Sequence, residues 1–188
     1  RYLPIGLVET GRGCRFRCEF CAVQTFFGAT HRARPVDAVV AELHARCDHV
    51  RLFFFIDDNF AADLAAAKEL LRALVPLRIR WVTQMSINAA HDEEFLQLLR
   101  ASGCQGVLIG FESLEPRNLR QMNKQFNTTR GGYEAAIANL RRHGIRLYAT
   151  FVFGYDEDTP ESVRAAVQFA IEQRCFIAAF NHLTPFPG

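Results

Sequence analysis

The chain has 188 residues, 49% of them hydrophobic, a composition that suits one well-packed domain. Its formal net charge of +2 gives no electrostatic indication of a nucleic-acid or membrane-surface partner. No apolar run reaches the roughly 20 residues of a membrane span. Nothing resembles a signal peptide, so the six cysteines indicate a reducing, cytoplasmic location rather than disulfides.

Strand and helix patterns alternate along the sequence. In chain order they predict a strand over 3–9, a helix over 37–47, a strand over 51–56, a helix over 64–75, a strand over 80–87, a helix over 92–102, a strand over 106–111, a helix over 133–143, a strand over 146–153, a helix over 159–174 and a strand over 176–183. Gly103 and Gly144 mark two helix ends, and Thr159 with Pro160 marks a helix start. Because no closing helix follows the last strand, we expect residues 1–188 to be the core domain of a longer protein.

Six strands that alternate with helices favour an α/β fold with a parallel sheet and right-handed crossovers. An open doubly wound sheet and a partial (β/α)6 TIM-type barrel both satisfy this pattern. The unusual polar residues all follow strands, and barrel active sites gather at the carboxyl ends of the strands. The partial barrel is therefore the predicted architecture.

Three cysteines, Cys14, Cys18 and Cys21, stand at C-x3-C-x2-C spacing in a loop after the first predicted strand. A closed structural zinc site uses four ligands, and a ferredoxin-type cluster uses four thiolates at other spacings. Three thiolates in one tight loop suggest an iron–sulfur cluster with one iron left open to a small molecule. A zinc site completed by a distant histidine is the alternative.

Polar residues at the ends of other strands are further candidates. Asp57, Asp58 and Asn59 follow an apolar strand, where two adjacent acids are costly unless they are solvated or bound to a cation. They are also compatible with a simple turn and helix cap. Glu112 emerges from a similarly apolar strand and requires a partner, either a ligand or a loop arginine. Ser86 and Asn88 follow the third predicted strand, where solvation alone would also explain them.

The cysteine spacing, with an aromatic residue directly before the third cysteine, resembles the radical S-adenosylmethionine (radical SAM) superfamily. The resemblance implies a six-stranded incomplete barrel in which the three cysteines hold a 4Fe-4S cluster and S-adenosylmethionine chelates the fourth iron. It implies an enzyme: one electron, from a donor such as flavodoxin or ferredoxin, cleaves the sulfonium, and the 5′-deoxyadenosyl radical abstracts hydrogen from a small-molecule substrate. The sequence does not identify that substrate or a further catalytic residue.

The same resemblance implies positions for cofactor contacts. Phe20 would lie near the adenine, and the residues after the second predicted strand, Asp57, Asp58 and Asn59, would accept hydrogen bonds from the amino group of S-adenosylmethionine. Ser86 and Asn88 would face its methionine or ribose part, and Glu112 its ribose. The fifth predicted strand resembles the family's G-x-I-x-G-x-x-E motif with Thr150 in place of the first glycine. The backbone at Val152 would contact adenine there, Gly154 would form a sharp turn, and Thr184, in the segment 183–188, would line the adenine pocket.

Three segments, 57–60, 121–124 and 183–188, resemble the cobalamin-associated subfamily, which includes methyltransferases and an anaerobic tetrapyrrole cyclase. No D-x-H-x-x-G motif occurs in the sequence, so cobalamin would bind to a domain outside it. Two other classes remain as alternatives. One is a non-catalytic iron–sulfur module for electron transfer or sensing, and the other is a zinc-stabilised binding domain.

Overall fold

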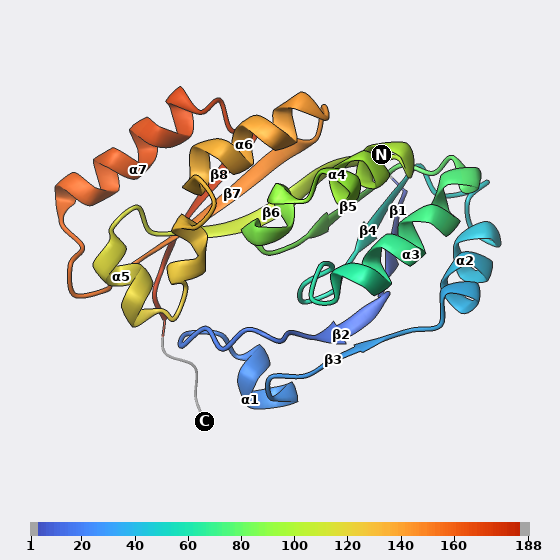
Figure 1. Cartoon of the computed structure of the whole chain (residues 1–188), viewed down its shortest axis with the longest axis horizontal. Coiled ribbons are helices and arrows are strands. Elements are labelled where there is room, and N and C mark those ends of the chain that lie inside the picture. The colour runs from blue at the N-terminus through green and yellow to red at the C-terminus, as the bar shows by residue number, and fades with distance from the viewer. Residues whose placement is uncertain (1–3, 185–188) are drawn as a thin grey trace.

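The computed structural model describes residues 4–184 and contains a six-stranded, fully parallel sheet. The strands are β1 (Ile5–Val8), β4 (Leu52–Phe55), β5 (Trp81–Gln84), β6 (Cys104–Glu112), β7 (Arg146–Phe153) and β8 (Ile177–His182), and they lie side by side in that order (Figure 1). A doubly wound sheet would reverse its strand order near the middle. Because the order follows the sequence throughout, the fold is the predicted partial (β/α)6 barrel.

Helices follow the strands along the chain, and most of them cover the outer face of the sheet, whereas the first, α1, lies apart from the sheet at the bottom of Figure 1. They are α1 (Val23–Phe27), α2 (Val36–His44), α3 (Leu64–Leu74), α4 (Glu93–Ala101), α5 (Pro116–Gln121), α6 (Gly132–Arg142) and α7 (Pro160–Glu172), with short 3-10 turns at Val75–Leu77, Ile87–His91 and Gln125–Thr128. Side chains cap several helix starts. Thr159 and Ser162 form a capping box at α7, and Asp63 and Asp92 accept hydrogen bonds from the first turns of α3 and α4. None of the helices in the described range combines the length and hydrophobicity of a membrane crossing.

All six predicted strands and five predicted helices are present, with different ends. The third strand stops at Gln84 and a 3-10 turn takes up Ile87, whereas the fourth strand is longer than predicted and begins at Cys104. Sequence patterns did not predict the hairpin of β2 (Gly11–Gly13) and β3 (His31–Ala33), or helices α1 and α5. These elements have three to six residues, too few for an apolar period to show.

Alternate side chains along each strand have different surroundings. Phe53, Phe55 and Trp81 point under the helices and are fully buried, and the Phe55 and Trp81 rings stack with centroids 4.6 Å apart. The neighbouring residues Leu52 and Phe54 face the inner side and are only half-buried. The sheet therefore has a helix-covered outer face, which supplies the core, and a concave inner face, which can hold a ligand.

Candidate functional site

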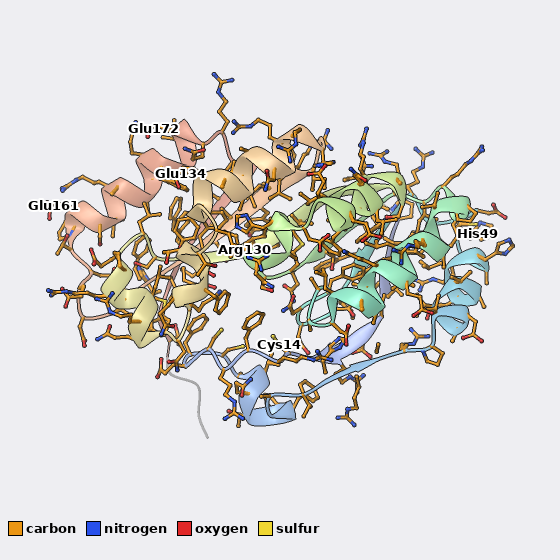
Figure 2. The ribbon with its side chains drawn as sticks, viewed as in Figure 1. Cys14, His49, Arg130, Glu134, Glu161 and Glu172 are labelled. Carbon is orange, nitrogen blue, oxygen red and sulfur yellow. The ribbon has the colours of Figure 1, made fainter. Side chains whose placement is uncertain are left out.

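The three cysteines lie in the loop enclosed by the β2–β3 hairpin, with Cys14 directly after β2 (Figure 2). The strands pair antiparallel from Gly11 opposite Ala33 to Gly13 opposite His31. Within the loop, the backbone N–H of Cys21 donates to the carbonyl of Cys18 at 3.2 Å. The hairpin thus fixes both ends of the loop, and a turn sets the Cys18–Cys21 spacing.

All three cysteines line one cavity of about 180 Å³. The opposite wall comes mainly from residues at or just beyond the carboxyl ends of β4, β5 and β6, with Thr150 from the middle of β7. The structure therefore brings together Cys14, Cys18, Cys21, Phe20, Asp58, Asn59, Ser86 and Glu112. Asp57, Asn88, Val152, Gly154 and Thr184 do not line this cavity.

The first two residues after Ile56, Asp57 and Asp58, accept hydrogen bonds from the segment that precedes the cysteine loop. Asp57 is buried and accepts hydrogen bonds from the backbone N–H of Thr10 at 3.2 Å and from its hydroxyl at 2.7 Å. Burial raises the pKa of the Asp57 carboxyl, and the Thr10 hydrogen bonds oppose this shift. Asp58 accepts from the N–H of Gly13 at 2.8 Å. Both acids therefore anchor the chain that leads into the cysteine loop.

Asn59 contacts a cysteine directly. Its Nδ2 donates to the Cys14 Sγ at 3.5 Å and to the Ser86 hydroxyl at 3.1 Å, while its Oδ1 accepts from the Ser86 N–H at 3.1 Å. The side chain is almost fully buried, so these bonds hold it in one orientation. An amide N–H aimed at a thiolate sulfur stabilises its negative charge.

Glu112 reaches the cavity through a β-bulge. The β6–β7 register shifts between Gly110 and Glu112, and Glu112 has φ +64°, an uncommon conformation for a residue with a side chain. Its carboxylate accepts from the Lys124 Nζ at 2.7 Å, and both side chains are buried. A Cβ atom at Gly110 would lie 2.0 Å from the Glu112 Oε1, so this pair requires the glycine.

Lys124 is a cavity residue that the sequence analysis did not select. It belongs to the segment 121–124 that resembles the cobalamin-associated subfamily. It lies twelve positions after Glu112, and no motif or period in the sequence indicates that the two side chains meet. The partner of Glu112 is thus a lysine and not the loop arginine considered above. The Nζ also lies 6.0 Å from the ring centroids of Phe20 and Phe126. This places the ammonium group beside the cysteine loop.

The cysteine loop packs on the segments that follow β6 and β7. The Phe16 ring stacks on Phe126 at 4.4 Å between centroids, and the Glu19 N–H donates to the Met122 carbonyl at 3.1 Å. The Tyr155 hydroxyl donates to the Glu19 carboxylate at 3.0 Å. These contacts connect a loop near residue 20 to positions more than 100 residues later, and so hold the loop over one side of the cavity.

Burial favours the protonated thiol form of Cys18 and Cys21. Burial raises the pKa of Cys18 to about 11, opposed by the nearby Lys124, and burial also raises the pKa of Cys21. Metal binding would therefore release protons from these thiols.

The donor set fits a 4Fe-4S cluster. In residues 4–184, no three His, Cys, Asp or Glu side chains converge closely enough to hold one metal ion. A 4Fe-4S cluster does not need such convergence, because each thiolate binds a different iron. Three thiols, an amide N–H on Cys14 and an ammonium group beside the loop supply the ligands and part of the charge compensation that such a cluster uses.

The other predicted residues have local roles. The backbone N–H of Gly154, at φ +123°, donates to the Asp158 carboxylate at 2.7 Å, so Asp158 orders this turn, while Glu157 pairs with Arg117 at 3.3 Å. Asn88 has a buried Oδ1 without a hydrogen-bond partner in the described residues. Val152 is half-buried on β7, and Thr184 is exposed. The rest of the predicted adenine segment, residues 185–188, lies outside the described residues.

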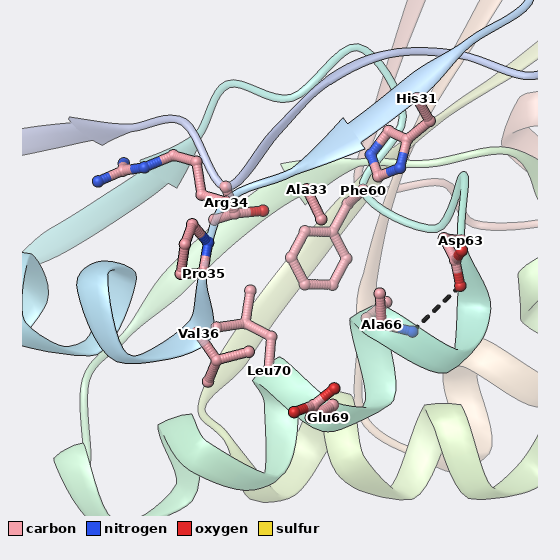
Figure 3. Close-up of a pocket in the computed structure, with 12 residues that line it drawn as sticks. His31, Ala33, Arg34, Pro35, Val36, Phe60, Asp63, Ala66, Glu69 and Leu70 are labelled. Carbon is pink, nitrogen blue, oxygen red and sulfur yellow. Dashed lines mark hydrogen bonds between the residues drawn. The ribbon is translucent and has the colours of Figure 1, made fainter.

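A second cavity, of about 240 Å³, lies on the other side of the hairpin, between β3 and α3 (Figure 3). Phe60 and Leu70 form part of its lining, and His31 lies at its upper right and Asp63 at its right side in this view. Asp63 is already engaged, because it caps α3 and pairs with Arg15 at 2.6 Å. This cavity contains no cysteine, so the candidate cofactor site is the one beneath the cysteine loop.

The comparison with family models decides the identity of this fold and site. Residues 8–170 match the model described as the radical SAM superfamily. The chain belongs to the radical SAM superfamily. The cofactors of such a domain are a 4Fe-4S cluster and S-adenosylmethionine, as the family resemblance implied.

Relatives and solved structures agree with this assignment. The chain is 36% identical over its full length to bacteriochlorophyllide d C-12(1)-methyltransferase of Chlorobaculum tepidum, covering 42% of that protein. It is 27% identical to the anaerobic magnesium-protoporphyrin IX monomethyl ester cyclase of Cereibacter sphaeroides, with 99% of the chain and 32% of that protein covered. A structure of the radical SAM methyltransferase TsrM from Kitasatospora setae, with cobalamin and a [4Fe-4S] cluster bound, superimposes with a TM-score of 0.83 at 27% identity over 95% of the chain and 34% of TsrM. The chain thus spans less than half the length of these relatives.

A substitution at Gly13 would show whether the geometry of the hairpin determines the position of the cysteine loop. It has φ +88°, and a Cβ atom there would lie 2.3 Å from the Thr30 carbonyl oxygen. We expect Gly13→Ala to shift Cys14 and lower the iron content after reconstitution, and to destabilise the fold by about 1–3 kcal/mol. Gly28→Ala is the matched control, because Gly28 also has positive φ but a Cβ there meets nothing within 4 Å. Equal iron loading of the two variants would contradict this role.

Proposed function

We propose that the full-length protein is a radical SAM enzyme in which Cys14, Cys18 and Cys21 hold the 4Fe-4S cluster. One observation carries the proposal: three thiols of one loop line a single cavity together with side chains from the carboxyl ends of three neighbouring strands, β4, β5 and β6. When bound, the reduced cluster supplies one electron that cleaves the sulfonium of S-adenosylmethionine to methionine and a 5′-deoxyadenosyl radical, which becomes 5′-deoxyadenosine on taking a hydrogen atom from substrate.

The chain's own residues would position the two cofactors. Asn59 orients Cys14 by its hydrogen bond to the sulfur, and Asp58 holds the hairpin through Gly13. Lys124 is the cationic side chain among the described residues of the cavity lining, so it would pair with the carboxylate of S-adenosylmethionine. Glu112, whose second oxygen makes no hydrogen bond within the described residues, would accept from the amino group or from a ribose hydroxyl.

Phe20 and Ser86 would complete the contacts with S-adenosylmethionine. The Phe20 ring lies at the same cavity edge as Lys124 and offers an apolar surface to the adenine. Ser86 has its hydroxyl fixed by Asn59 and faces the cavity from the end of β5. Together with the stacked Phe16 and Phe126, these side chains would keep water away from the reacting bonds.

The reaction that follows is proposed to be methyl transfer to a small-molecule substrate in the cytoplasm, with cobalamin bound by a part of the protein outside these residues. The methyltransferase relative at 36% identity and the cobalamin-bound TsrM support this choice. The cyclase relative supports an oxidative cyclisation as the second candidate. A small acidic electron carrier such as flavodoxin or ferredoxin would deliver the electron.

The test is anaerobic and uses the full-length protein. After reconstitution with iron and sulfide and chemical reduction, S-adenosylmethionine is added and 5′-deoxyadenosine is measured by chromatography; the same sample is extracted and its corrinoid measured by absorbance. Both molecules are expected. Absence of a corrinoid would remove the cobalamin part of the proposal. A reducible cluster that neither binds nor cleaves S-adenosylmethionine would favour an electron-transfer module, and bound zinc without a cluster would end the iron–sulfur proposal.

A further inference from the structure

The largest of the three cavities described here, about 430 Å³, lies at the opposite end of the sheet from the cysteine loop. Its lining comes from the amino-terminal ends of all six strands, on the concave inner face. Most of the lining side chains are apolar: Ile5, Leu52, Phe54, Val82, Val107, Leu108, Phe176 and Ile177. A volume of this size, with apolar walls and few polar groups, is typical of small-molecule sites.

Two exposed arginines are among the residues that line this cavity. Arg80 precedes β5 and Arg146 begins β7, and both line the cavity on either side of the first residues of β6. Neither guanidinium forms an ion pair within residues 4–184. The Arg146 guanidinium lies 5.4 Å from the centroid of the Phe176 ring, which also lines the cavity. The stacking holds this guanidinium beside the apolar lining.

Apolar walls and two unpaired arginines are complementary to an amphipathic anion. The apolar part of such a ligand would remove exposed side chains from water, since Ile5 is 51% exposed and Phe176 65% exposed. Its anionic group would receive charge-assisted hydrogen bonds from the guanidinium groups, whose fork geometry matches a carboxylate. A neutral apolar molecule would use only the walls, and a cation would be repelled.

We propose that this cavity binds a small molecule with an apolar body and a carboxylate, and that Arg80 and Arg146 bind the carboxylate. Leu108 lines both this cavity and the cysteine-lined cavity, so the two adjoin on the inner face. A molecule held by the arginines would extend along the inner face toward the cofactors. The cavity would then hold the non-reacting part of the substrate, an assignment that rests on the function proposed above.

The test measures binding directly and does not require the radical reaction. Decanoate, 1-decanol and decylamine are titrated into the full-length protein by calorimetry, below their micelle concentrations. Decanoate is expected to bind at least about tenfold more tightly than 1-decanol, because a hydrogen bond to a charged group typically changes a dissociation constant by about that factor. Decylamine is expected to bind most weakly, because its ammonium group is repelled by the arginines. Equal affinities for decanoate and 1-decanol, or no binding of decanoate, would overturn the proposal.

Variants locate the site. The double variant Arg80→Gln with Arg146→Gln is expected to lower the affinity for decanoate to that for 1-decanol. Val82→Phe fills the cavity and is expected to lower the affinity for both ligands. Arg51→Gln is the matched control, because Arg51 is an exposed arginine just before β4 that does not line the cavity. Loss of decanoate binding in this control to the same extent would contradict the assignment.

The same variants separate this proposal from the proposed function. Neither arginine lines the cysteine cavity, so formation of 5′-deoxyadenosine without added substrate should stay within about twofold of the wild type. If binding fails while S-adenosylmethionine is still cleaved, only the ligand proposal is wrong.

Discussion

Replacing Cys18 with alanine is expected to abolish formation of 5′-deoxyadenosine, leaving less than about one hundredth of the wild-type rate. Cys18 occupies the middle of the three-cysteine spacing, and its sulfur lines the cavity beside Lys124. Without this thiolate the cluster has only two protein ligands, and no other cysteine lines the cavity to replace it. The measurement is chromatography of the anaerobic reaction, together with iron content and the visible absorbance of the reconstituted protein.

Cys47→Ala is the matched control for this substitution. Cys47 is also a half-buried cysteine, but it lies after α2 and its thiol donates to the carbonyl of His44. Its loss should leave iron content and 5′-deoxyadenosine formation unchanged. Product formation by Cys18→Ala at the rate of the Cys47→Ala control would refute the assignment of the cysteines as cluster ligands.

The substitution Lys124→Met has the second large expected effect. It removes the partner of the Glu112 carboxylate, whose side chain is 8% exposed, and leaves a buried charge uncompensated. Breaking a buried ion pair in this way typically costs about 3–5 kcal/mol of unfolding free energy. If Lys124 also binds the carboxylate of S-adenosylmethionine, the dissociation constant of the cluster-loaded variant should rise by at least about tenfold. Denaturant unfolding and equilibrium dialysis measure the two quantities.

Two further variants separate stability from binding. The double variant Glu112→Gln with Lys124→Met removes both charges, so it should recover much of the stability but none of the affinity. Arg117→Met breaks an exposed ion pair with Glu157 and should cost no more than about 1 kcal/mol. Wild-type affinity in the double variant would show that Lys124 acts on the fold alone.

The architecture was largely predictable because its signals are local. The alternation of apolar runs with helical periodicity placed every strand of the sheet, and the Thr159–Pro160 start and the Gly103 end are read from neighbouring residues. The choice of barrel over doubly wound sheet came from the position of polar residues after strands, and the sequential strand order confirmed it. The hairpin was missed because its strands are three residues long and pair across the whole cysteine loop.

The sequence by itself determined the succession of strands along the chain and the three thiols, because strand and helix periods and a short cysteine spacing are properties of neighbouring residues. Its resemblance to a known family indicated the radical SAM superfamily. Only the tertiary structure decided which side chains reach the cavity. The Asp57 side chain accepts a hydrogen bond from Thr10, 47 positions away, whereas the Asn59 side chain donates to Cys14. Beyond the end of a strand the alternation of side chains stops, so the sequence does not show which of these neighbouring residues faces the cavity. Lys124 reaches Glu112 through a bulge in β6, whose effect depends on the register with β7. Such contacts join segments that are distant in the sequence, so they depend on how the chain packs and are not predictable from neighbouring residues.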